Sequence, residues 1–185
     1  MPSPSNYEGP TPVIETARLR MRAHRVEDLD DCAAMWADPE AVRHIGGRPF
    51  SREEVWARLL RYAGHWALLR FGYWAVEERA TGAFAGELGF ADFQREMESP
   101  LRGLPELGYA FASRTRGRGY ATEAACAAVA WGDVHFASSR TACLIHPVNL
   151  ASIRVAEKCG YREFARATYK GEPSIVLVRQ GPVPK

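Results

Sequence analysis

The segment Arg114-Thr-Arg-Gly-Arg-Gly-Tyr-Ala-Thr-Glu123 joins a stretch of strand character at 106–112 to an alanine-rich stretch expected to be helical at 122–137. The first backbone N–H groups of a helix have no partner within the helix and carry partial positive charge, so such a junction suits an anion. Gly117 and Gly119 have no side chain to hold the backbone away from ligand oxygens. The segment therefore predicts a phosphate or pyrophosphate site.

Three known loop patterns use this geometry, and their spacing separates them. A Walker loop needs G-x-x-x-x-G-K-[ST], and the absence of that lysine argues against kinases and ATPases. The dinucleotide fingerprint G-x-G-x-x-G has Thr122 where its last glycine belongs, and it lies late in the chain. The pattern R/Q-x-x-G-x-G/A is matched in full by Arg114, Gly117 and Gly119. This match resembles the pyrophosphate loop of the GNAT superfamily of N-acetyltransferases.

Outward from this loop, apolar periodicity and turn signals predict a mixed α/β domain. Ser51-Arg-Glu-Glu54 has the form of a helix capping box, and Asn149 or its neighbour can cap a later helix. Residues 94–105 have a loop composition. The expected elements, in chain order, are a strand at 13–23, helices at 26–37 and 52–66, strands at 72–78, 84–90 and 106–112, a helix at 122–137, a strand at 141–146, a helix at 149–160, and strands at 161–169 and 174–179.

Composition limits the class of protein. The chain has 185 residues, 46% of them hydrophobic, which predicts one domain at 13–185 after a flexible tail at 1–12 that resembles neither a signal peptide nor a membrane anchor. A net charge of +2, with both signs interleaved, argues against nucleic acid as a partner. No stretch is apolar for long enough to span a bilayer, so we expect a soluble protein without a membrane partner.

The cysteines predict neither a metal site nor a disulfide framework. They form no C-x-x-C pair and have no matching histidine spacing, so free thiols in a reducing cytoplasm are expected. The four positions are Cys32, Cys126, Cys143 and Cys159.

Further segments extend the resemblance to the GNAT superfamily. Residues 149–161 are similar to the helix that flanks the pantetheine arm of the donor in that family, and residues 14–22 and 106–109 resemble its ribosomal-protein-alanine N-acetyltransferase branch. The resemblance covers nearly everything from 13 to 179. It implies a central, mostly antiparallel twisted sheet that is splayed in the middle, with helices on both faces.

The resemblance also implies acetyl-CoA as the co-substrate. In this family the donor lies between two splayed strands, which here are those around 110–113 and 141–146. The implied donor-binding residues are Phe111 and Ala112 through backbone amides, Arg114, Arg116, Gly117, Arg118, Gly119, Tyr120, Ala121 and Thr122 at the pyrophosphate, Asn149 beside the pantetheine, and Lys158, with the arginines, at a nucleotide phosphate.

The family reaction is direct attack of a neutral amine on the thioester, which needs a base and an acid. The resemblance nominates Glu106 as base, acting through water, with Glu87 in reserve; the alternative for Glu106 is a structural pair with an arginine. The tyrosine that many relatives use as acid is replaced by Ala156. Ser152 resembles the serine of the ribosomal-protein branch, although a serine there can also serve the helix end. His146 is a candidate relay.

The expected activity is N-acetylation of a primary amine, either a peptide N-terminus or a small molecule. Residues 24–70 and 92–105 should shape the acceptor pocket, but their mixed charges name no acceptor. A non-catalytic acetyl-CoA sensor is the alternative, and a nucleotide-dependent oxidoreductase is a third option. Exposed final strands would allow a homodimer.

Overall fold

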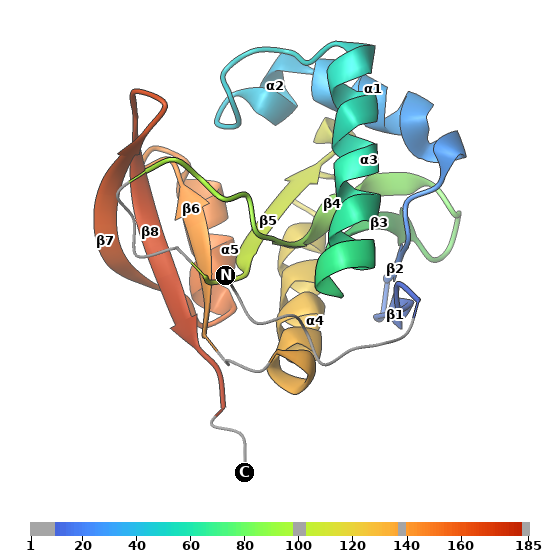
Figure 1. The fold of residues 1–185 in the computed structure, drawn as a ribbon. Coiled ribbons are helices and arrows are strands. Elements are labelled where there is room, and N and C mark those ends of the chain that lie inside the picture. The colour runs from blue at the N-terminus through green and yellow to red at the C-terminus, as the bar shows by residue number, and fades with distance from the viewer. Residues whose placement is uncertain (1–9, 98–102, 137–139, 183–185) are drawn as a thin grey trace.

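The computed structural model describes residues 10–97, 103–136 and 140–182. The expected tail and loop therefore lie partly outside the described residues. The elements are β1 (Ile14–Glu15), β2 (Leu19–Arg22), η1 (Val26–Asp28), α1 (Leu29–Ala37), α2 (Pro39–Val42), α3 (Arg52–Leu69), β3 (Tyr73–Glu78), β4 (Phe84–Ala91), β5 (Glu106–Phe111), η2 (Ser113–Thr115), α4 (Tyr120–His135), β6 (Arg140–Ile145), α5 (Leu150–Lys158), β7 (Arg162–Tyr169) and β8 (Glu172–Gln180) (Figure 1).

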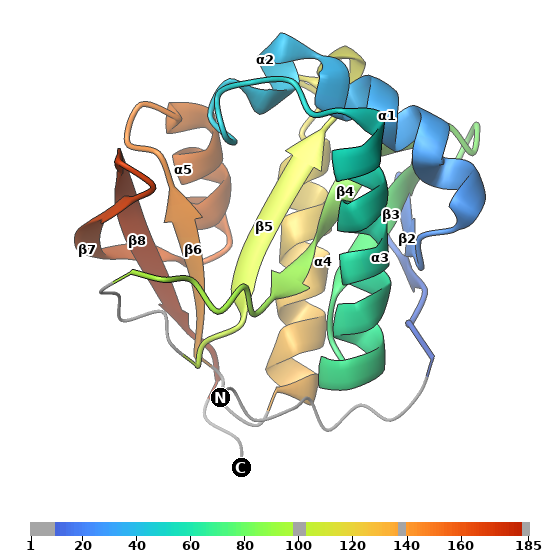
Figure 2. The ribbon, with the colours of Figure 1, turned by 45° about the horizontal axis from the view of Figure 1, so that its top comes forward.

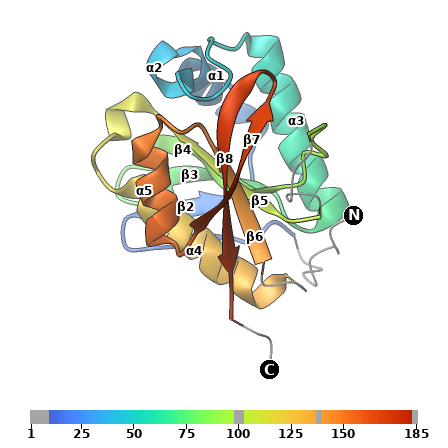
Figure 3. The same ribbon diagram turned by 90° about the vertical axis from the view of Figure 1, so that its left-hand side faces the viewer.

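The strands form one eight-stranded sheet in the order β1-β2-β3-β4-β5-β6-β8-β7. Neighbouring strands are antiparallel except β5 and β6, which are parallel. Helices α1 and α3 cover one face, and α4 and α5 cover the other (Figures 1 and 3). The mixed α/β class, the mostly antiparallel sheet and helices on both faces are confirmed. Within the described residues, no helix is long and apolar enough to cross a membrane.

The two largest hydrophobic clusters lie on opposite faces of the sheet, because successive side chains of a strand point to opposite faces. In β5, Leu107 joins the core beneath α4, whereas Ala110 joins the core beneath α1 and α3. Glu106 has the same parity as Ala110, and Glu87 on β4 lies directly opposite Ala110. Both acidic residues therefore lie on the sheet face that α1 and α3 cover.

The prediction of a single strand at 13–23 is wrong, because the structure has two short antiparallel strands, β1 and β2, in this segment. Thr16 closes the turn between them: its N–H donates to the Leu19 carbonyl at 2.9 Å, and its hydroxyl oxygen accepts from the Leu19 N–H at 3.0 Å. The turn contains no glycine or proline, so nothing in the sequence marked a break in the alternation of apolar and polar residues that predicted one strand. Helix α2 was also not expected, although Asp38 caps it and Pro39 occupies its first turn.

The buried ion pair of Arg22 and Asp28 makes stability depend on pH. Arg22 donates to both Asp28 oxygens at 2.7 Å. Burial raises the pKa of Asp28, but hydrogen bonds from Arg22 and the Arg25 N–H outweigh it and hold the pKa below its usual value. A carboxyl with a depressed pKa stabilises the fold above its unfolded pKa, and this stability is lost as pH falls through the folded pKa.

We therefore expect the melting temperature to fall as pH is lowered below about 4, the usual pKa of an aspartate. It should fall less steeply in Asp28→Asn, which has no carboxyl to titrate. Thermal unfolding followed by circular dichroism from pH 7 to acid measures both slopes. Asp30→Asn, at an exposed position on α1, is the control and should keep the wild-type slope. Equal slopes in all three proteins would contradict the assignment.

Candidate functional site

The parallel strands β5 and β6 separate almost as soon as they begin. Their register has one pair, Glu106 with Ala142, and the Ala142 N–H donates to the Pro105 carbonyl at 3.0 Å. Beyond that point no pairing between the two strands is found in the described part of the chain, and Figure 2 shows them diverging toward α2. Backbone groups along both inner edges are thus left for an extended ligand, which would bind like an added strand. The splayed sheet is confirmed.

Adjacent residues of β5 direct their N–H groups to opposite edges. The Ala112 N–H donates to the Ala85 carbonyl at 3.0 Å, on the β4 side, so the amide contact predicted for Ala112 is already used within the sheet. Phe111 has the opposite parity, which turns its N–H toward the gap. The amide of Phe111 is therefore better placed than that of Ala112 to meet a ligand between the strands.

The loop after β5 ends at the N-terminus of α4. A 3-10 turn at Ser113–Thr115 closes with the Thr115 hydroxyl donating to the Ala112 carbonyl at 2.7 Å. Gly117 and Gly119 have φ angles of 73° and 77°, a left-handed conformation that glycine adopts without strain. Helix α4 begins at Tyr120, two residues before the expected start.

The N-terminus of α4 is open to a ligand. Gly119 is the N-cap residue and has no side chain that could accept a hydrogen bond, so the N–H groups of the first turn, including those of Ala121 and Thr122, donate to no capping side chain. This turn lies at the same end of the molecule as the widest part of the gap (Figure 2). The loop thus brings the predicted anion site to the end of the gap.

The three arginines of the loop are about half-exposed, and each lies near a carboxylate. Arg116 is 3.1 Å from Glu40, and Arg118 is 2.8 Å from Glu78. Arg114 is 3.6 Å from the same Glu78 and also donates to the Phe84 carbonyl. Exposed pairs of this kind contribute roughly 0–1 kcal/mol, so a phosphate can displace them at small cost.

Asn149 caps α5, as expected: its side-chain oxygen accepts from the Ser152 N–H at 3.2 Å. The Ser152 carbonyl accepts from the Tyr109 hydroxyl at 2.9 Å, which ties α5 to β5. Lys158 is exposed at the opposite end of α5. Its neighbour Cys159 lies 3.3 Å, sulfur to sulfur, from Cys126 in the second turn of α4. The C-terminal end of α5 thus packs against the second turn of α4, and the phosphate contact of Lys158 stays a prediction.

Glu106 is paired with an arginine that the sequence did not identify. Arg95 donates from Nε at 2.8 Å and from Nη2 at 2.6 Å, one bond to each Glu106 oxygen. The Arg95 guanidinium lies over the rings of Phe93 and Tyr169, at 4.6 and 4.5 Å from their centroids. Each carboxylate oxygen has a second lone pair, so the remaining pair can still bind a water. Glu106 can therefore pair with Arg95 and still act as the predicted base.

Glu87 is fully buried on the same face. The Tyr62 hydroxyl donates to its Oε1 at 2.5 Å, and His24 Nε2 lies 3.7 Å from its Oε2. Burial raises the pKa of Glu87, but His24, Arg58 and Tyr62 outweigh it and lower the pKa. The reserve base is thus held ionised by neighbours that sequence spacing could not reveal.

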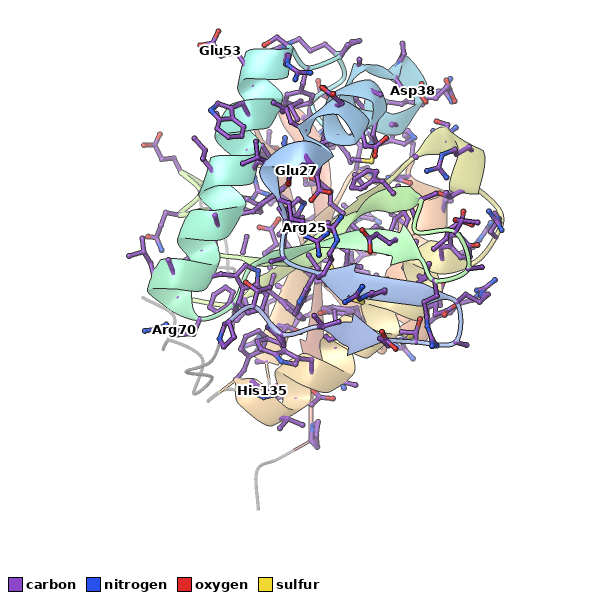
Figure 4. The ribbon with its side chains drawn as sticks, turned by 90° about the vertical axis from the view of Figure 1, so that its right-hand side faces the viewer. Arg25, Glu27, Asp38, Glu53, Arg70 and His135 are labelled. Atoms are coloured by element: carbon purple, nitrogen blue, oxygen red, sulfur yellow. The ribbon has the colours of Figure 1, made fainter. Side chains whose placement is uncertain are left out.

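His146 lies at the end of β6, near the wide end of the gap. Its ring stacks on that of His44 with centroids 6.0 Å apart, and its Nε2 is 3.7 Å from Glu172. Burial, together with His146, lowers the pKa of His44. Asp38, labelled in Figure 4 near α2, accepts a hydrogen bond from Ser113 and ties the α1–α2 junction to the loop. Segments distant in sequence thus meet around this end of the gap.

Comparisons with known proteins agree with this geometry. The sequence pattern of the acetyltransferase (GNAT) domain matches residues 18–162. YkkB, an uncharacterized protein of Bacillus subtilis (strain 168), is 35% identical over 153 residues, which cover 80% of this chain and 83% of that protein. A structure from Bordetella pertussis, described as a GNAT-family acetyltransferase, is 30% identical, has a TM-score of 0.79, and is matched over 91% of this chain and 99% of that one.

A second structure shares the fold alone. RimL, a ribosomal-protein acetyltransferase solved in complex with coenzyme A, has a TM-score of 0.74 at 14% identity, over 92% of this chain and 98% of that one. The family pattern spans most of the chain and includes both the splayed strands and the glycine-containing loop. The chain belongs to the GNAT family of acetyltransferases.

Proposed function

We propose that the protein transfers an acetyl group from acetyl-CoA to a primary amine, by direct attack in a ternary complex. The observation that carries this proposal is the gap between β5 and β6, which ends at the open N-terminus of α4. An extended pantetheine arm fits between strand edges, and a pyrophosphate suits unpaired N–H groups at the start of a helix. RimL, which shares the fold, is described with coenzyme A bound, which supports the same donor here.

In the proposed complex, the pantetheine arm of the donor lies along β5, and the pyrophosphate binds at Arg116–Thr122. The amine approaches from the face that α1 and α3 cover, where Glu106 lies. Glu106 removes the ammonium proton through a water, and a backbone N–H in the gap polarises the thioester carbonyl that the neutral amine attacks. As the carbon–sulfur bond breaks, Ser152 gives its proton to the departing thiolate and regains one from the nitrogen, which leaves the amide and the free thiol. The sequence does not identify the acceptor, so both a peptide N-terminus and a small-molecule amine are tested.

The Ser152 assignment predicts a modest loss of turnover. Because a thiolate is already a good leaving group, Ser152→Ala should lower kcat about tenfold, below the usual range of general acid catalysis, with little change in KM for acetyl-CoA. The cap of α5 should survive, since Asn149 binds the backbone N–H of Ser152. Steady-state kinetics measure the effect, and Ser174→Ala, a buried serine on β8, is the control. Unchanged kcat would remove Ser152 from the mechanism.

Thiol release from acetyl-CoA, measured with a panel of peptides and small amines, tests the function. We expect turnover with at least one amine and an acetylated product detected by mass spectrometry. Binding of coenzyme A without transfer to any amine would instead identify a sensor, an alternative suggested by Ala156 at the position of the usual tyrosine. A thermal shift with nicotinamide nucleotides and none with coenzyme A would favour an oxidoreductase.

A further inference from the structure

Three metal-ligating side chains meet in the interior, beneath α1. Glu87 on β4 and Cys32 on α1 are fully buried, and the side chain of His24, which follows β2, is 5% exposed. One ligand atom from each residue lies within 4.8 Å of the other two. Arg25 and Glu27, labelled in Figure 4, are exposed just beyond His24, so the inward position of His24 differs from that of its neighbours.

Three polar atoms of this cluster have no hydrogen-bond partner among the described residues. They are Nδ1 and Nε2 of His24 and Oε2 of Glu87, all shielded from solvent. The distance of 3.7 Å between His24 Nε2 and Glu87 Oε2 is too long for a hydrogen bond. Buried polar atoms are nearly always satisfied in folded proteins, so this cluster calls for a partner. A cation coordinated by both residues would satisfy one nitrogen and the carboxylate oxygen together.

From this geometry we infer that His24, Cys32 and Glu87 bind one zinc ion. Imidazole nitrogen, thiolate sulfur and carboxylate oxygen are the donors that zinc accepts in proteins. A divalent ion with one thiolate, one carboxylate and a neutral histidine has no net charge, which suits burial. Arg58, whose guanidinium lies 4.0 Å from the ring centroid of Trp36, is a nearby cation. A neutral metal site would not repel it.

The surroundings supply an outer shell for the ion. The Tyr62 hydroxyl holds Glu87 through Oε1, which leaves Oε2 for the metal. A cavity of about 290 Å³ beside the cluster is lined by His24, Tyr62 and Arg70, among others. A tetrahedral site would take a water as its fourth ligand. The bound ion would tie α1 and the segment after β2 to the central strand β4.

This site departs from the expectation that the cysteines bind no metal. That expectation rested on spacing along the chain, where zinc ligands often occur in pairs a few residues apart. Here the ligands come from three elements separated by up to 63 positions, from His24 to Glu87, so only the fold brings them together. The inference concerns binding alone and does not rest on the proposed transferase activity.

The test is a titration of the full chain, purified without a histidine tag and treated with a chelator, with Co²⁺ and then Zn²⁺. We expect one equivalent of Co²⁺ per chain, a thiolate-to-cobalt absorption band, and displacement of the band by Zn²⁺. Cys32→Ser should lose the band and bind at least tenfold more weakly. Cys143→Ser, at a cysteine equally buried on β6, is the matched control and should keep both.

His24→Gln provides a second variant should Cys32→Ser not fold, as checked by circular dichroism, and it too should bind at least tenfold more weakly. Failure of the wild-type chain to bind Co²⁺ or Zn²⁺ would overturn the inference and leave His24 and Glu87 as buried neighbours without a metal. Retention of the band by Cys32→Ser, or its loss in Cys143→Ser, would overturn it equally. Acetyl transfer by a protein that binds no metal would reject this site while leaving the proposed function intact.

Discussion

Reversing the charge of Arg116 and Arg118 together is expected to weaken coenzyme A binding by about 100-fold or more. Hydrogen bonds to charged groups contribute roughly 1.5–3 kcal/mol each, and the variant removes two cations and adds two anions beside the proposed pyrophosphate site. Both side chains are about half-exposed, so the core is not disturbed. Isothermal titration calorimetry with coenzyme A, at one fixed ionic strength, measures the loss.

The control for this prediction is Arg166→Glu on β7, where an exposed arginine also pairs with a glutamate, Glu163. It should bind coenzyme A like the wild type, because it lies outside the loop. The reversed residues would face Glu40 and Glu78, so thermal unfolding is measured alongside binding to exclude a folding defect. Unchanged affinity in a folded double variant would contradict the assignment of the loop to the pyrophosphate.

Replacing Glu106 with glutamine is expected to lower kcat by about 10²–10⁴, the usual contribution of a general base. Glutamine has nearly the same shape but cannot take the ammonium proton. The acid limb of the pH–rate profile should also change, since the group that must be ionised has been removed. Stopped-flow or steady-state measurement of thiol release across pH, with saturating acetyl-CoA, measures both effects once an acceptor is known.

Arg95→Gln separates the chemical role of Glu106 from its structural one. This variant breaks the same ion pair but keeps the carboxylate. If Glu106 is the base, Arg95→Gln should lose far less turnover than Glu106→Gln, although both lose some stability. Equal losses in the two variants would mean that the ion pair, and not proton transfer, is what turnover requires.

The elements with strong local signals were predictable from the sequence. The capping box at Ser51–Glu54 is confirmed, with the Glu54 N–H 3.2 Å from the Ser51 hydroxyl. The glycines of the loop were recognised because the pattern around Arg114 depends on residues next to one another. The cap at Asn149 was found for the same reason, since it involves positions three apart.

Contacts between distant segments were not predictable. The pairing of Arg95 with Glu106 was expected only as a type of contact, because nothing local to β5 names its partner. The Tyr62 bond to Glu87 joins residues 25 positions apart, and His24 lies still farther from Glu87 in sequence. The short turn at Thr16 was missed because it contains no glycine or proline, although both the backbone and the side chain of Thr16 close it. The domain extent and the assigned site residues stay predictions.

A crystal structure with coenzyme A and an amine acceptor tests the central claim most directly. We predict the pantetheine between β5 and β6, the pyrophosphate on the N–H groups at Arg116–Thr122, and the amine within one water of Glu106. A donor bound outside the gap, or one whose pyrophosphate does not touch the start of α4, would contradict the account.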